Sequence, residues 1–126
     1  EFSCWSHAPL RDGILDQCLE LGVTPMAWSP LGGGRLAQPA NEMADSPDKN
    51  RLTDLLNVLD QIAEEQDKTR TQVALAWVLR HPAKPIPILG TQRPERIQEG
   101  AGALEVTLSR TQWNAILVAA QGEPLP

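Results

Sequence analysis

The chain has 126 residues and a mass of 13.8 kDa, which suits a single domain with a modest buried core. Its hydrophobic content of 41% and charged content of 21% are ordinary for a globular protein, and no apolar run approaches the roughly 20 residues of a membrane-spanning helix. A net charge of −5, with eleven scattered Lys and Arg residues, excludes the basic stripe of a nucleic-acid-binding protein.

The cysteines and the first residues indicate the cellular compartment of the protein. Cys4 and Cys18 lack the spacing of a metal site, and a secreted disulfide scaffold of this length usually carries more cysteines. We therefore expect a reduced, cytoplasmic protein. Residues 1–5 have neither the basic start nor the apolar core of a signal peptide and include no Met. We therefore expect the sequence to begin within a strand.

The first half of the chain predicts one helix, one strand and two loops. Apolar residues recur at helical spacing over 10–21, and Gly22 follows as a stop signal. The short apolar run 24–28 predicts a buried strand, and it opens into three consecutive glycines at 32–34, which favour a loop. Residues 37–50 are rich in Pro, Asn and Asp and predict a surface loop.

The second half predicts helices around one further strand. Residues 52–63 follow the i, i+3, i+4, i+7 pattern of an amphipathic helix. A capping-box signature opens a helix over 69–80, and the compact apolar run 86–89 predicts a short strand. Two further helices are predicted over 94–104 and 109–120, the first opened by a proline and the second by another capping box.

This order of elements indicates the fold class. Strands alternating with helices are typical of parallel α/β folds, in which right-handed crossovers cover the sheet. Counting the first residues as the end of a strand gives three strands, which are too few to close a barrel. A closed (β/α)8 barrel needs about 250 residues. We therefore predict that residues 1–126 form one α/β segment that amounts to about half of such a barrel.

The first candidate site is the segment 28–34, where a strand end delivers an aromatic ring and then a run of glycines. Glycines let backbone N–H groups approach an anion closely, so the chemistry suggested is a phosphate cradle beside a flat ring. The alternative is a core tryptophan followed by a flexible turn. This segment matches neither a Walker A nor a GxGxxG motif, and both interpretations stay open on spacing alone.

The second candidate site is the segment 88–96, where a strand end meets a helix N-terminus. Backbone donors, a hydroxyl and two guanidinium groups come together there, which favours anion binding. The alternative is a solvated helix start in which Arg93 and Arg96 pair with Glu95 or Glu99. Because both candidate sites follow strands of one parallel sheet, both lie at its carboxyl edge, where α/β proteins bind ligands.

Three segments together resemble a known family. Residues 28–34, 72–77 and 87–97 resemble consecutive landmarks of the aldo-keto reductase superfamily, in matching order and spacing across almost the whole chain. The resemblance implies a partial (β/α)8 TIM barrel made of strands 6–8 with their helices and a C-terminal helix, in which residues 1–2 end the sixth strand. It also implies a parent enzyme, similar to bacterial oxidoreductases, that reduces aldehydes or ketones with NADPH.

The resemblance further implies roles for individual residues. Trp28 would stack on the nicotinamide, and the glycine loop after it would wrap the pyrophosphate. Thr91 and Arg96 would contact the adenosine 2′-phosphate, and Glu99 the adenine side. The predicted cofactor-binding residues all lie in or next to the two candidate sites: Trp28, Ser29, Leu31, Gly33, Arg35, Gly90, Thr91, Gln92, Arg93, Arg96 and Glu99.

Two positions depart from the family pattern. Gly90 stands where many members have Lys, and Gly100 stands where many have Asn, which affects the 2′-phosphate and adenine contacts respectively. Arg93 is placed to supply the missing charge. NADPH is therefore the expected cofactor in preference to NADH.

The catalytic groups of the family are missing. Members transfer a hydride from the nicotinamide to a carbonyl carbon while a Tyr protonates the oxygen and Lys, Asp and His assist, but this chain contains no Tyr. His7 and His81 match no family position, and we expect both to be solvated. We assign no catalytic residue and no metal site, and we expect this segment alone to be inactive.

Two functions from different classes stay open. In the first, the chain supplies the cofactor-binding wall of an NADPH-dependent oxidoreductase. In the second, it is a non-catalytic nucleotide-sensing or protein-interaction module on the same scaffold. The expected partners are a small carbonyl substrate, the missing N-terminal half of the barrel, and further copies of the chain that meet at the exposed half-barrel edge. No nucleic acid or membrane is expected.

Overall fold

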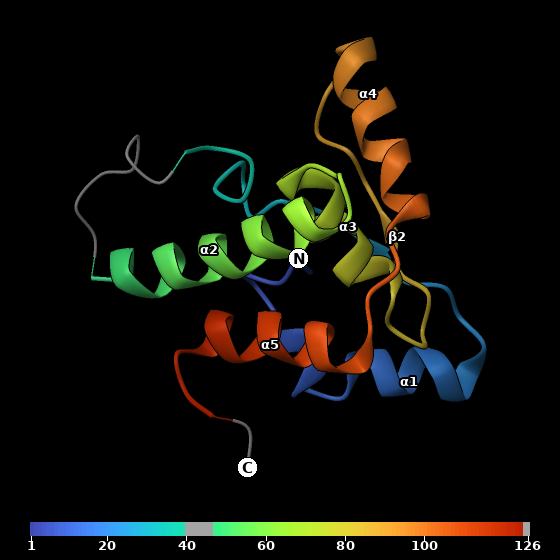
Figure 1. Cartoon of the computed structure of the whole chain (residues 1–126). Helices are drawn as coiled ribbons and strands as arrows, with labels where there is room; N and C mark the ends of the chain where they lie inside the picture. The colour runs from blue at the N-terminus through green and yellow to red at the C-terminus, as the bar shows by residue number, and fades with distance from the viewer. Residues whose placement is uncertain (40–46, 125–126) are drawn as a thin grey trace.

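The computed structural model describes residues 1–39 and 47–124, and Figure 1 shows its arrangement. Within these residues no helix is long and apolar enough to cross a membrane. The elements in chain order are η1 (Ala8–Leu10), α1 (Ile14–Leu21), β1 (Met26–Ala27), α2 (Lys49–Glu65), α3 (Arg70–Leu79), β2 (Ile86–Pro87), α4 (Pro94–Ala101), η3 (Gly102–Glu105) and α5 (Arg110–Gln121).

The strands β1 and β2 form a parallel pair in which Ala27 lies opposite Pro87. The N–H of Ile86 donates to the carbonyl of Pro25 at 2.9 Å, and the N–H of Ile88 donates to the carbonyl of Ala27 at 2.9 Å. Because alternate residues of a strand point their backbone groups to opposite sides, Pro87 faces away from β1. Its missing N–H therefore costs no hydrogen bond within this pair.

The core lies in a layer formed by α2, α3 and α5, in which α2 packs against both of the other helices (Figure 1). The ring of Trp77 stacks on Trp113 with centroids 4.7 Å apart and planes at 6°. Each indole N–H donates to the backbone carbonyl of the other residue, at 3.1 and 3.0 Å. Around this pair the fully buried side chains include Leu55, Leu59, Val73, Val78 and Ile116.

Both predicted capping boxes are present. The Thr69 hydroxyl accepts the N–H of Gln72, and the Gln72 amide oxygen accepts the N–H of Thr69. Ser109 and Gln112 make the same reciprocal pair at the start of α5. Each pair satisfies two backbone donors that the first helical turn leaves without partners.

The other helix predictions are confirmed with shifted ends. The helix predicted over 10–21 begins at Ile14, because η1 and a left-handed Gly13 precede it. The helix predicted over 52–63 runs from Lys49 to Glu65. The single helix predicted over 94–104 divides into α4 and η3. Of the predicted surface loop 37–50, residues 40–46 lie outside the described residues, and its last two residues belong to α2.

The strand predictions need larger corrections. Both strands are shorter than the apolar runs 24–28 and 86–89 that predicted them. Residues 1–2, predicted to end a third strand, form no strand: the N–H of Phe2 donates to the carbonyl of Trp28 at 3.3 Å, a single bond where a ladder needs several. The described residues therefore hold two parallel strands among helices, an α/β arrangement consistent with part of a barrel.

The two faces of this small sheet differ sharply in burial. Ala27, which points toward the helices, is 3% exposed. On the other face Met26 and Trp28 of the first strand region are 67% and 57% exposed, and Ile86 and Ile88 of the second are 53% and 42% exposed. This row of large apolar side chains, which we call the open face, has no cover within residues 1–39 and 47–124.

Candidate functional site

The glycine-rich turn, residues 29–38, follows β1 directly. Ser29 adopts φ = 53°, and its hydroxyl accepts the N–H of Gly33 at 3.0 Å, which closes the turn. Gly32, Gly33 and Gly34 all have positive φ, at 60°, 65° and 92°, where an L-residue would be strained. Gly32 also lies against the side chain of Trp5, so a Cβ there would stand only 3.3 Å away. The turn thus needs glycines for its backbone path.

The second part of the site is the start of α4. Pro94 occupies the first turn, where its missing N–H costs no helical bond. Just before it, the hydroxyl of Thr91 accepts the N–H of Arg93 at 3.2 Å, which orients the chain as it enters the helix. The remaining first-turn N–H groups and the helix dipole favour an anion at this end.

These two parts face each other across a cavity of about 460 Å³, a volume typical of small-molecule sites. The third part of its wall is the first turns of α3. The cavity is lined by Ser29, Pro30, Leu31, Gly33, Gly34, Ala37, Gln38, Thr71, Leu75, Leu89, Gly90, Thr91, Arg96, Glu99 and Gly100. Segments about sixty residues apart in the sequence therefore share one site, at the carboxyl ends of β1 and β2.

The cavity brings together most of the residues proposed from the sequence. Seven of them line it: Ser29, Leu31, Gly33, Gly90, Thr91, Arg96 and Glu99. The structure thus joins the two candidate sites into one. The remaining four, Trp28, Arg35, Gln92 and Arg93, do not line it.

These four residues are either exposed or bonded to a neighbouring group. Trp28 is exposed on the open face, and Gln92 is exposed in the loop before α4. Arg35 folds back and donates to a carbonyl of its own turn at 3.0 Å. Arg93 forms an ion pair with Glu95 at 2.7 Å. This pair was predicted by the alternative interpretation of segment 88–96 as a solvated helix start. The backbone N–H of Glu95 and then Arg93 hold the pKa of that carboxyl below its usual range.

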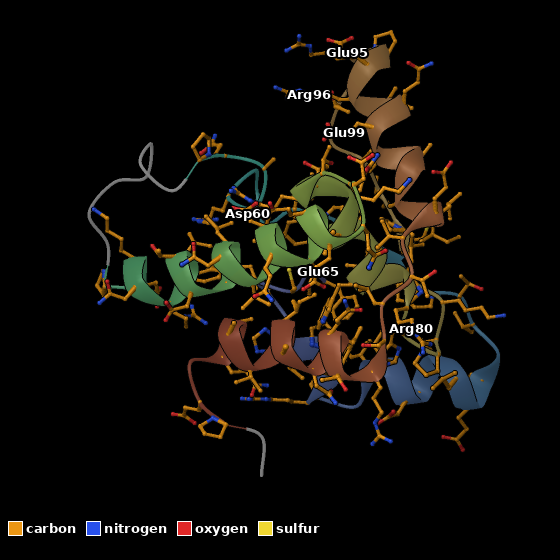
Figure 2. All side chains as sticks on the ribbon, in the orientation of Figure 1. Asp60, Glu65, Arg80, Glu95, Arg96 and Glu99 are labelled. Carbon is orange, nitrogen blue, oxygen red and sulfur yellow. The ribbon has the colours of Figure 1, made fainter. Side chains whose placement is uncertain are left out.

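Arg96 differs from Arg93. It makes no ion pair within the described residues, and it lines the cavity together with Glu99 one turn later. Figure 2 shows both side chains on the side of α4 that faces α3. A guanidinium that forms no ion pair, beside a helix N-terminus, favours an anionic ligand.

The part of the wall that comes from α3 and from the end of the turn was not predicted from the sequence. Thr71 and Leu75 line the cavity four residues apart on one helix face, and Gln38 lines it beyond the glycines. The i, i+4 spacing was visible in the sequence, but only the fold shows that this face meets α4. At Gly100 a Cβ would stand 2.8 Å from a methyl of Leu89, which explains a small residue there.

The two histidines, which were expected to be solvated, are partly buried, and each has a hydrogen-bond partner. Nδ1 of His7 lies 3.2 Å from the carbonyl of Cys4 and donates to it, and Nδ1 of His81 accepts the N–H of Ala83 at 3.1 Å. Burial lowers the pKa of both imidazoles. Burial also raises the pKa of the Cys4 thiol to about 12. None of these groups lines the cavity, and the described ranges contain no cluster of three metal-ligating residues.

Comparisons with known proteins show to which family the chain is related. The sequence profile described as "Aldo/keto reductase family" matches residues 2–120. A "6-dehydroglucose reductase" of Novosphingobium aromaticivorans is 48% identical over 124 residues, which cover 94% of this chain and 38% of that protein. A protein of the same name from Agrobacterium fabrum is 40% identical over 98% of this chain and 38% of its own length.

A solved structure shares the fold. The thermostable aldo-keto reductase Tm1743, crystallised with the inhibitor epalrestat, matches with a TM-score of 0.68 and 29% identity over 94% of this chain. This chain covers 38% of that structure and 38% of each of the two reductases. The resemblance seen in the sequence is thereby confirmed, and the chain belongs to the aldo/keto reductase family.

Proposed function

We propose that the cavity binds NADPH and that this chain supplies the cofactor-binding wall of a longer oxidoreductase that reduces an aldehyde or ketone. Family membership and the reductase names of its relatives support the reaction class. The cofactor assignment rests on one observation: the glycine-rich turn and Arg96 line the same cavity. When bound, the cofactor supplies the hydride, and the residues of this chain bind and orient it.

The chemistry of the cavity fits a dinucleotide. Gly33 and Gly34 present backbone without side chains on one wall, so a phosphate group can approach closely. The hydroxyl of Thr91 and the N-terminus of α4 stand on the other wall. The exposed ring of Trp28, next to the turn, offers an apolar surface for the nicotinamide.

The choice of NADPH over NADH rests on Arg96. Its guanidinium has no ion-pair partner within residues 1–39 and 47–124 and offers several donors to a 2′-phosphate, which NADH lacks. Two relatives are named for the reduction of 6-dehydroglucose. A sugar-derived aldehyde is therefore the first substrate to test with the full-length protein.

The open face supports a partner within the parent protein. We propose that the N-terminal half of the barrel covers Met26 and Ile86 and supplies the catalytic groups that this chain lacks. Residues 1–126 alone would then show no carbonyl reduction. Because Cys4 and Cys18 are free thiols, we also propose that the protein works in the cytoplasm.

The decisive experiment is a pair of dissociation constants for NADPH and NADH, measured by isothermal titration calorimetry on the full-length protein. Arg96→Ala should weaken NADPH by about ten- to a hundredfold, because hydrogen bonds to charged groups contribute about 1.5–3 kcal/mol each, and it should weaken NADH little. Trp28→Ala should weaken both cofactors similarly, since they share the nicotinamide. An equal loss of both cofactors in Arg96→Ala would contradict the proposed pocket. Cofactor binding without turnover of any carbonyl would favour the non-catalytic module.

A further inference from the structure

The glycine-rich turn is closed by hydrogen bonds of its own backbone, and Leu36 near its end is fully buried in the core. The carbonyls of Ser29, Leu31 and Gly34 accept N–H groups from within the same segment, at 2.9 to 3.2 Å. Three consecutive glycines also give the backbone of this segment more conformational freedom than other residues would. Beyond Leu36, a further contact at the end of the turn would help to keep this wall at a constant distance from the opposite wall.

Arg70, the first residue of α3, makes such a contact. Its Nη1 donates to the carbonyl of Gln38 at 2.6 Å, at the end of the turn. The other side of the same guanidinium binds Asp60 of α2 in a bidentate pair, with Nε to Oδ1 at 2.6 Å and Nη2 to Oδ2 at 2.5 Å. In Figure 2 Asp60 projects from α2 toward the end of the turn. One planar group thus joins α2, α3 and the turn.

The arginine of this bridge is partly buried, whereas the carboxylate is exposed. The side chain of Arg70 is 21% exposed and that of Asp60 is 48% exposed. A guanidinium held by two bonds to a carboxylate loses much of its freedom, so its remaining donor stays aimed at the turn. The geometry makes Asp60 the group that orients Arg70, and Arg70 the group that holds Gln38.

The same first turn of α3 also fixes the opposite wall. Thr71 lines the cavity next to Arg70, and the side-chain amide of Gln72 donates to the carbonyl of Glu99 on α4 at 3.0 Å. Gln38 and Glu99 both line the cavity, one on each wall. Two residues of the first turn of α3, Arg70 and Gln72, therefore contact the two walls and link them through one helix.

We infer that Arg70, oriented by Asp60, is a positioning residue for the nucleotide: it holds the glycine-rich turn against α3 and so slows release of the bound cofactor. This inference rests on the proposed function. Arg70 would act on the width of the cavity, whereas Arg96 would bind the 2′-phosphate. Loss of Arg70 should therefore affect NADPH and NADH alike.

The test measures the dissociation rates of NADPH and NADH by stopped flow on the full-length protein carrying Arg70→Gln. We expect about a tenfold faster release of both cofactors, the effect of losing one charge-assisted hydrogen bond. Hydrogen exchange of the amides in residues 29–38 should also become faster in the cofactor-free protein. Arg70→Lys should restore the slow release only in part, because one ammonium group cannot bind Asp60 and Gln38 with the fork geometry of a guanidinium.

The chain offers a matched control at Lys68. This residue lies two positions before Arg70, its side chain is 22% exposed, and it pairs with Glu105 at 2.5 Å without reaching the turn. Lys68→Gln removes an ion pair whose cation is as exposed as Arg70, and it should leave both release rates and the exchange of residues 29–38 unchanged. If Arg70→Gln proves too unstable to purify, Asp60→Asn removes the orienting carboxylate and should shift release in the same direction.

The outcomes separate the two ideas. If the unmodified protein binds neither cofactor, the proposed function fails and this inference fails with it. If it binds NADPH but the Arg70 and Asp60 variants release it at the original rate, the inference alone is overturned. An equal acceleration in Lys68→Gln would also overturn it, because the effect would then reflect general destabilisation.

Discussion

The helix layer and the open face of the sheet are built from similar apolar residues but differ in completeness. In the layer of α2, α3 and α5, Trp77 is fully buried and its indole N–H is bonded. On the open face, Trp28 and Met26 are mostly exposed, although they flank the buried Ala27. Within the described part of the chain, the helix layer therefore has a complete core, whereas one face of the strands is left uncovered.

The largest effect that would test this comparison is expected at Trp77. Trp77→Ala removes a fully buried ring, its stacking on Trp113 and a hydrogen bond, so it should lower the free energy of unfolding by about 3–5 kcal/mol. Met26→Ala shortens a side chain on the open face and should change it by less than about 0.5 kcal/mol. Urea unfolding of residues 1–126 followed by circular dichroism measures both. Similar losses in the two variants would show that the open face is packed in solution.

A middle-sized effect is expected at a cap of the helix layer. Ser109→Ala removes the hydroxyl that accepts the N–H of Gln112 and should cost about 1 kcal/mol of unfolding free energy. Thr111→Ala, on an exposed position of the same helix, is the matched control and should be nearly neutral. The same urea titrations apply. If the two variants were equally stable, α5 would owe its start to packing and not to the capping box.

The smallest effect on stability, and the clearest one on association, is expected on the open face. Met26 and Ile86 lie opposite each other in the strand register, and both are exposed. The double variant Met26→Ser, Ile86→Ser should alter the unfolding free energy by less than about 0.5 kcal/mol, while it reduces self-association of residues 1–126, because a contiguous apolar patch seeks cover. Sedimentation velocity at several concentrations measures this. A chain that is monomeric without the substitutions would argue against an uncovered barrel wall.

The sequence predicts the features that depend on local chemistry. The two capping boxes involve residues three positions apart, and both are present in the structure. The candidate segments 28–34 and 88–96 both begin at the carboxyl end of a strand, so their convergence on one edge followed from the rule for parallel sheets. Seven of the proposed residues accordingly line one cavity, although their roles toward a cofactor remain predictions.

The features that the sequence did not predict depend on distant contacts. Nothing near Thr71 indicates that its helix closes the cavity, because this depends on how α3 packs against the turn and α4. Arg93 and Arg96 look equivalent in the sequence, yet one has a carboxylate two residues away at the right geometry and the other does not. The strand expected at residues 1–2 failed for the same reason, since a strand forms only with neighbours that complete its ladder.

The placement of the four tryptophans gives this chain separate optical reporters. No tyrosine contributes to its near-ultraviolet spectrum. The parallel stack of Trp77 and Trp113 should dominate the near-ultraviolet circular dichroism, a signal that disappears when side-chain packing is lost. Trp5 lies under the guanidinium of Arg51 at 3.9 Å, and Trp28 is exposed beside the cavity. A red-shifted emission from Trp28 should therefore respond to occupancy of the site, while the stacked pair reports independently whether the chain is folded.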